Sequence, residues 1–223
     1  YICRQDYFDR LNAHAKGDGP PLVILGESGA GKSALLTHWV RRYREELKTQ
    51  PQKGEVGSLH PTSSRADSNL QLSQKTHVIV HFIGATKEST NWAAMLRRLI
   101  REFNRLFSLK IGIPDEPDAL RQAFAEALWQ VDTRGRVILI IDALNQLDDR
   151  DGSLDLVWLP PEIPKNIRLI VSTLSGRSLD ILKERNWSTF TIEPLTIDER
   201  QNLIVNYLRQ YSKTLPSDLV QKI

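Results

Sequence analysis

The sequence predicts an α/β fold in which helices cover both faces of a parallel β-sheet. Five short apolar segments have the length and composition of buried strands, and helical patterns separate them. A glycine-rich segment follows the first of these strands directly and precedes a helical pattern. The expected strands are residues 22–25, 78–83, 137–141, 167–173 and 189–192.

The glycine-rich segment Gly26–Ser33 reads GESGAGKS and fits the pattern G-x-x-x-x-G-K-[ST]. Glycines in this pattern let backbone N–H groups surround a phosphate, while Lys32 reaches the outer phosphates and the Ser33 hydroxyl binds Mg²⁺. A helical pattern over residues 33–46 follows, and its N-terminus favours an anion. A chance match is the alternative, against which the flanking strand and helix argue. The remaining residues expected to line the phosphate site are Gly26, Glu27, Ser28, Gly29, Ala30, Gly31 and Ala34.

Residues 89–107 form an amphipathic helical pattern that predicts a core-facing helix. Its apolar stripe consists of Trp92, Met95, Leu96, Leu99, Ile100, Phe103, Leu106 and Phe107. The opposite side carries four arginines, which could contact the phosphates of a nucleic acid or form a solvated face with their stems along the surface. These arginines are Arg97, Arg98, Arg101 and Arg105.

Two further helices are expected. Residues 118–131 place Leu120, Phe124, Leu128 and Val131 inward. Thr196 stands three residues before Glu199, which predicts a capping box at the start of another helix. That helix has an apolar stripe of Leu203, Ile204, Tyr207 and Leu208.

Residues 54–75 are rich in polar residues without apolar periodicity, so we expect a mobile surface loop.

Asp142 ends the most apolar strand segment, VILIID. A phosphate-binding loop needs a carboxylate at the tip of another strand to hold Mg²⁺, although an aspartate can also cap a strand or begin a turn. Because strand 78–83 lies between the two motifs in the chain, we infer that strand 167–173 separates the two motif strands in the sheet. That order would direct Ser172 and Thr173 at the γ-phosphate.

The composition is that of one large domain, or of one domain and a fragment of another. The chain has 223 residues, of which 40% are hydrophobic, and a formal net charge of +3, which is weak evidence for nucleic-acid or membrane binding. No apolar run is long enough to span a bilayer, and the single cysteine, Cys3, excludes an internal disulfide. These features predict a reducing, cytoplasmic setting. The absence of an initial Met and the helical pattern at the end suggest a piece of a longer polypeptide.

Five segments together resemble one family of signalling ATPases. They are GESGAGKS, HFIGATKEST, IIDALNQL, RLIVSTLSGRSLDIL and IEPLTIDERQNLIVNYL. They are similar to the NACHT-type branch of the signal-transduction ATPases with numerous domains (STAND), and most similar to its nephrocystin and telomerase-associated-protein group. The resemblance implies a P-loop NTPase core of the additional-strand type with sheet order 5-1-4-3-2. It also implies three regions, which are an N-terminal flanking helix (1–19), the core (20–194) and the start of a helical lid (195–223).

The family resemblance also implies a function. Members hold ATP or ADP with Mg²⁺ as a switch, open when ADP is exchanged for ATP, and then self-associate to activate a fused effector. C-terminal repeats of the tetratricopeptide (TPR) or WD type would lie outside this chain, as would an adenine-contacting proline beyond Ile223. Residues 1–7 could cover one side of the adenine.

The chain departs from the family pattern after the magnesium-binding aspartate. Many NACHT proteins carry acidic residues three and four positions after it, where this chain has Asn145 and Gln146. Amides can orient a water molecule but cannot take its proton, so we expect a weak ATPase with slow turnover. Asp148 and Asp149 could substitute as the base, or could belong to a solvated acidic loop.

Two further residues each have two interpretations. Arg177 follows the fourth strand, where a cation could approach the γ-phosphate, but it could equally serve in helix-start packing or an ion pair. His81 could face the site or be a core histidine with satisfied hydrogen bonds.

Two rival functions remain open at this point. One is a fast P-loop enzyme, such as a nucleic-acid motor or a kinase, in which the arginine-rich helix face would contact nucleic acid. The other is a scaffold that binds nucleotide for stability without hydrolysing it.

Overall fold

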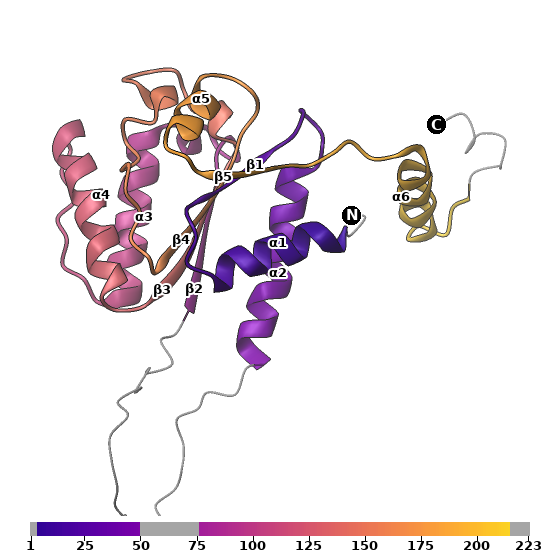
Figure 1. Ribbon diagram of the computed structural model, residues 1–223, viewed down its shortest axis with the longest axis horizontal. Coiled ribbons are helices and arrows are strands. Elements are labelled where there is room, and N and C mark those ends of the chain that lie inside the picture. Colours follow the sequence, from indigo (N-terminus) through magenta and orange to yellow (C-terminus); the bar gives the residue numbers. More distant parts are fainter. Residues whose placement is uncertain (1–3, 50–75, 215–223) are drawn as a thin grey trace, which may run out of the picture.

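The computed structural model describes residues 4–49 and 76–214 (Figure 1). The loop expected over residues 54–75 lies outside the described residues. Within the described ranges, no helix is both long and apolar enough to cross a membrane.

The core is a five-stranded parallel sheet with the order β2-β3-β4-β1-β5. This confirms the predicted order 5-1-4-3-2 and the inference that β4 separates the two motif strands. The pairs Ile24↔Ser172 and Phe82↔Asp142 align the carboxyl ends of the strands at one edge of the sheet. The strands are β1 (Leu22–Leu25), β2 (Thr76–Phe82), β3 (Arg136–Asp142), β4 (Ile167–Ser172) and β5 (Ser188–Thr191).

One face of the sheet is covered by α3 (Trp92–Phe107) and α4 (Pro117–Asp132), as Figure 1 shows. The predicted stripe of α3 is confirmed, because its side chains from Trp92 to Phe103 are buried and the last two are partly buried. The helix α5 (Arg177–Glu184) adds Leu179 and Leu182 to the same cluster.

The opposite face is covered by α1 (Gln5–Lys16) and α2 (Lys32–Thr49). The apolar side chains of α2 that face the sheet are buried, and they include Leu35, Leu36, Trp39 (1% exposed) and Val40. The indole Nε1 of Trp39 donates to Asn12 Oδ1 at 2.9 Å, which joins the two helices.

The C-terminal end of α1 is held by arginines from the sheet. Arg168 on β4 donates to His14 O at 3.0 Å, and Arg136 on β3 donates to Ala15 O at 3.0 Å and to Gly17 O at 2.6 Å. The last carbonyls of a helix have no partner within it, so these guanidinium groups satisfy them.

The helix α6 (Ile197–Arg209) lies apart from the sheet (Figure 1). Its predicted capping box is confirmed, since Thr196 Oγ1 accepts from Glu199 N while Glu199 accepts from Thr196 N. No residue of α6 is buried, and its predicted apolar stripe stays partly open, with Tyr207 57% exposed. Short 3₁₀ helices occupy Lys87–Thr90, Leu144–Gln146 and Ser153–Asp155.

Candidate functional site

The phosphate loop joins β1 to α2 at the carboxyl edge of the sheet, where open α/β sheets bind ligands. Its first residue, Gly26, has φ of 150°, and a Cβ there would lie 2.9 Å from Ile192 O. Gly31 has φ of 93°, a conformation that residues with a side chain rarely adopt. The local backbone therefore requires glycine at both ends of the loop.

The loop has unpaired donors and open space around it. Within the described residues, the amides of Gly29, Gly31 and Lys32 have no acceptor, and the first amide of α2 to pair is Leu35 N with Gly31 O at 2.8 Å. A Cβ added to Gly29 or Gly31 would meet no atom within 4 Å. Free amides at a helix N-terminus favour an anion, so the loop fits a phosphate group.

Lys32 lies inside the loop and is 9% exposed. Its Nζ donates to Gly26 O at 2.6 Å and to Glu27 O at 2.9 Å, so the ammonium group is held among loop carbonyls. Burial lowers the pKa of Lys32, and the nearby carboxylate of Asp142 opposes that shift. Lys32, predicted to contact the phosphates, and Asp142, predicted to hold Mg²⁺, therefore lie close enough to interact.

Asp142 ends β3 and is 2% exposed. Its Oδ1 accepts a hydrogen bond from Ser172 Oγ at the end of β4. The same Ser172 Oγ accepts a hydrogen bond from Ala143 N at 2.9 Å. We expected Ser172 to face the γ-phosphate, but its hydroxyl instead serves Asp142 and the turn after it. Ala143 has φ of 63°, so this bond holds a backbone conformation that is uncommon for alanine.

The residues present fit Mg²⁺. Ser33 is exposed in the first turn of α2, and Asp142 supplies a carboxylate at the end of β3, the other motif strand. Magnesium in such sites takes one or two protein oxygens, with water and phosphate as the other ligands. Ser33 and Asp142 are the residues that would hold the ion.

The two amide residues after Asp142 lie on the 3₁₀ turn Leu144–Gln146 and are both exposed. A Cβ on Gly84 would lie 1.8 Å from Gln146 Oε1, so the Gln146 side chain lies directly against the loop after β2. Asn145 makes no side-chain hydrogen bond to the described residues. Neither residue can act as a general base.

Arg177 begins α5 and forms ion pairs with two aspartates. Its Nη2 lies 2.7 Å from Asp149 Oδ1, and its Nε lies 2.8 Å from Asp155 Oδ1. The ion-pair interpretation left open by the sequence is therefore the one found in this conformation. Asp148 is exposed, and its carboxylate has no partner among the described residues, although its backbone N–H donates to Thr90 O at 3.0 Å.

His81 is a core histidine with satisfied hydrogen bonds. It is 7% exposed, its Nε2 lies 3.1 Å from Ser89 O, and its Nδ1 accepts from Arg98 Nε at 3.2 Å. Burial lowers the pKa of His81. Two more arginines of α3 are engaged locally, because Arg97 donates to Asp115 O and Arg105 pairs with Glu102.

The sequence missed a contact between the N-terminal segment and the predicted lid. Arg4 Nε donates to Glu199 Oε1 at 2.7 Å, and its Nη2 binds the other carboxylate oxygen. Arg4 also donates to Glu193 O at 2.7 Å and Pro194 O at 2.9 Å, and Tyr7 Oη accepts from Glu193 N at 3.1 Å. The capping box revealed Glu199, but no sequence signal pairs it with a residue 195 positions away.

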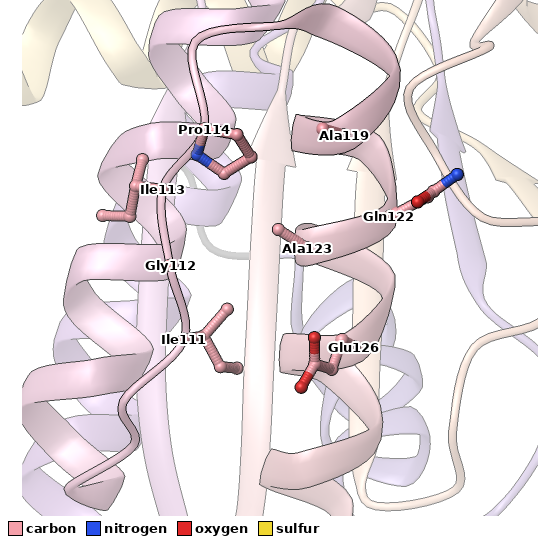
Figure 2. Close-up of a pocket in the computed structure, with 8 residues that line it drawn as sticks. All are labelled: Ile111, Gly112, Ile113, Pro114, Ala119, Gln122, Ala123 and Glu126. Atoms are coloured by element: carbon pink, nitrogen blue, oxygen red, sulfur yellow. The ribbon is translucent and has the colours of Figure 1, made fainter.

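A separate groove of about 490 Å³ lies between α4 and the extended segment 111–114 (Figure 2). Apolar side chains of Ile111, Ile113 and Ala123 line it, with the Glu126 carboxylate at one end. None of the residues predicted from the sequence to bind nucleotide lies in this groove.

Comparison with curated proteins finds relatives of the expected group. The chain is 27% identical to a TPR repeat-containing protein of Dictyostelium discoideum over 88% of this chain and 13% of that protein. It is 25% identical to nephrocystin-3 of Xenopus tropicalis over 91% of this chain and 14% of the relative. It is 27% identical to NACHT and WD repeat domain-containing protein 2 of Mus musculus over 70% of this chain and 8% of that protein. The chain thus spans about a seventh or less of these relatives, which confirm the resemblance to NACHT-type NTPases.

Among solved structures, the Orc1 protein of Aeropyrum pernix in complex with DNA matches with a TM-score of 0.58 and 15% identity. The match covers 96% of this chain and 49% of the Orc1 chain, and at this identity it shows the fold alone. A family model described as an AAA ATPase domain matches residues 1–171. This match takes in the phosphate loop, Asp142, the strands β1 to β3 and all of β4 but its last residue. The chain therefore belongs to the AAA ATPase domain family.

Proposed function

We propose that this chain is the ATP-binding core of a signal-transduction switch that hydrolyses ATP slowly with Mg²⁺. The observation that carries the proposal is the contrast between a phosphate loop whose lysine lies near a carboxylate and the amides found where the family carries acidic residues. Lys32 and Asp142 interact within one site, whereas the positions after Asp142 carry only the amides of Asn145 and Gln146.

The binding step uses the loop from Gly26 to Ser33. Its free amides would receive the phosphates, and Lys32 would move its ammonium group from the loop carbonyls to the outer phosphates. Bound Mg²⁺ would neutralise charge on the phosphates. Ser172 supports this step by fixing one oxygen of Asp142.

The hydrolysis step would be slow because proton transfer from water lacks a strong acceptor. Asn145 and Gln146 can orient water but cannot accept its proton. Of the two candidate bases, Asp149 is paired with Arg177, whereas the carboxylate of Asp148 has no partner among the described residues. Phosphoryl transfer depends mainly on positioning and electrostatics, so a missing base slows hydrolysis without preventing it.

The switch step would couple nucleotide to the lid. The junction between β5 and α6 lies against Gly26 of the phosphate loop and is bound by Arg4, which also holds Glu199 at the start of α6. A ligand shifts such an equilibrium only through its difference in affinity for the closed and open forms. Two of the relatives are named for TPR or WD repeats, which supports repeats in a longer protein around this core. In the proposed switch, those repeats would sense a ligand in the cytoplasm, and the core would self-associate to activate an effector.

The test is single-turnover ATP hydrolysis with enzyme in excess, comparing the unmodified protein with Asp148→Asn and Asp149→Asn. A held switch predicts turnover over many minutes that neither substitution changes appreciably. Turnover within seconds that collapses in one variant would overturn slow hydrolysis and identify a displaced base. Strong stimulation by added DNA or RNA would favour a nucleic-acid motor, and binding without any hydrolysis would favour a scaffold.

A further inference from the structure

Another pocket, of about 340 Å³, lies at the end of the sheet opposite the phosphate loop. It lies between α1, the segment that precedes β1 and the first residues of β5. All strands of the sheet are parallel, so their starts share one edge, whereas the phosphate loop follows the end of β1. A ligand in this pocket would therefore occupy a site separate from the one proposed for ATP.

Arg168 places a buried positive charge at the wall of this pocket. The residue is 3% exposed, and the other charged side chains buried to a similar degree among the described residues are Lys32 and Asp142, which lie near each other. Arg168 forms no ion pair within the described residues, since its acidic neighbour Asp18 lies 3.8 Å from Arg136 instead. Buried charges are usually paired with an opposite charge, so an anion beside Arg168 would be favourable.

Neutral groups occupy three of the five N–H donors of the Arg168 guanidinium. Its Nε donates to His14 O at 3.0 Å, its Nη1 to Gly19 O at 2.7 Å, and its Nη2 to His14 Nδ1 at 3.1 Å. The carbonyls at the end of a helix carry about half an elementary charge together, so they offset the guanidinium charge only in part. One N–H on each terminal nitrogen has no acceptor among the described residues and can donate to a ligand.

Arg10 on α1 adds a second guanidinium group to the lining of the pocket. Its guanidinium carbon lies 5.6 Å from the centre of the Phe190 ring. Such a contact holds the cation over the ring and leaves its N–H donors free, and Arg10 has no hydrogen bond or ion pair with the described residues. No carboxylate lines this pocket. Two positive charges therefore border it without an acidic side chain between them.

The start of β5 adds neutral donors and an apolar surface. The strand lies at the edge of the sheet, and Ser188 N donates to Pro21 O at 3.1 Å, toward β1. Because backbone groups of alternate residues point to the same side of a strand, the N–H of Thr189 points to the free edge. Ser188 and Thr189 line the pocket together with Phe190. The volume is at the lower end of the range for small-molecule sites, which is about 300–1,000 Å³.

We propose that this pocket binds the phosphate group of a small phosphorylated molecule, with Arg10 and Arg168 as its charged partners and Phe190 in contact with the rest of the ligand. Guanidinium groups suit phosphate because their planar N–H donors match its oxygens. A phosphate monoester carries a charge of about −1.5 to −2 at neutral pH, which matches two unpaired guanidinium groups better than the single charge of a carboxylate does. Its remaining oxygen can accept from the hydroxyl or amide groups at the start of β5.

The first experiment titrates phenyl phosphate into the protein and follows the backbone amides by NMR. Mg²⁺ and a non-hydrolysable ATP analogue are present throughout, so that phosphate-loop binding is seen separately at Gly29 and Gly31. We expect the Thr189 amide to shift with a saturable dissociation constant. Arg10→Gln should raise that constant about tenfold or more. The matched control is Lys16→Gln, which removes one charge from an exposed position of the same helix outside the pocket and should leave it unchanged.

The second experiment tests the chemical class of the ligand. Benzoate offers the same aromatic body with a carboxylate, and we expect it to bind about tenfold or more weakly than phenyl phosphate. Arg168→Gln should also weaken binding, and if it lowers the melting temperature, the exposed Arg10→Gln remains the test. The inference is overturned if phenyl phosphate leaves the Thr189 amide unshifted at millimolar concentration, if Arg10→Gln binds as tightly as Lys16→Gln, or if benzoate binds as tightly as phenyl phosphate.

Discussion

The hydroxyl of Ser172 donates a hydrogen bond to the carboxylate of Asp142 across the neighbouring ends of β4 and β3. Both side chains are almost fully buried, and the same hydroxyl accepts the amide of Ala143. Ser172 therefore orients the carboxylate proposed to hold Mg²⁺ and also fixes the turn that leads to Asn145. The position of the proposed metal site therefore depends on a serine that does not itself need to contact nucleotide.

We predict that Ser172→Ala weakens Mg²⁺ binding and destabilises the fold. The substitution leaves the buried Ala143 amide without its acceptor and removes a donor from Asp142, with a cost of about 1–3 kcal/mol in the free energy of unfolding. Urea unfolding measures the stability, and the Mg²⁺ dependence of ATP binding measures the site. The control is Ser178→Ala, a buried serine that donates to Leu154 O instead. Equal effects of the two substitutions on Mg²⁺ affinity would remove the special role of Ser172.

Lys32→Ala should sharply weaken ATP binding. Bound nucleotide raises stability in proportion to the logarithm of its concentration over its dissociation constant, so the ATP-dependent rise in melting temperature should be lost. Lys48→Ala, near the other end of α2, is the matched control and should keep the rise. An unchanged rise in Lys32→Ala would count against the phosphate site.

The contact between Arg4 and Glu199 should hold α6 against the rest of the chain. Hydrogen bonds that Glu199 accepts from Arg4, and a further one from the Thr196 amide, lower the pKa of Glu199 to about 2. An unfolded glutamate has a pKa near 4.3, so the contact adds stability above that pH and loses it as the pH falls toward 2. We expect Arg4→Met to accelerate proteolysis within α6 at neutral pH. Gln5→Ala, which affects only an exposed contact with Asp9, should leave the cleavage rate unchanged. Equal cleavage rates in Arg4→Met and the unmodified protein would refute the role of Arg4.

Acid should destabilise the fold through His14. Burial, with a smaller effect from the Arg168 charge, lowers the pKa of His14 to about 4. Between about pH 6.5 and pH 4 the unfolded histidine binds a proton that the folded one excludes, so stability falls as the pH falls, by at most about 1.4 kcal/mol per pH unit. His14→Gln should flatten the dependence of the melting temperature on pH, whereas the exposed His38→Gln should not. A slope that stays the same in His14→Gln would mean that other groups cause it.

The parts of the fold that the sequence predicted are those set by local patterns. Continuous apolar runs identified the strands, and strand 78–83 lying between the two motifs in the chain indicated that β4 separates the motif strands. The full order of the sheet was implied by the family resemblance. The stripe of α3 and the capping box of α6 were equally local, and both are confirmed.

The unpredicted parts depend on contacts between residues far apart in the sequence. The direction of the Ser172 hydroxyl depends on the register of β3 against β4, and the pairing of Arg177 depends on the path of the loop that carries Asp149 and Asp155. The expected roles of Asn145, Gln146 and Arg177 in hydrolysis stay predictions.

The arginine contacts beneath α1 also set an order for folding. Arg136 and Arg168 reach back 121 and 154 residues to cap the end of that helix. The ribosome makes α1 before β3 and β4, so the last carbonyls of α1 gain these partners only once both strands have emerged. The cap of α1 is therefore completed only after β3 and β4 are in place, and Arg4, which precedes α1, can engage Glu199 only after every strand of the sheet has been made.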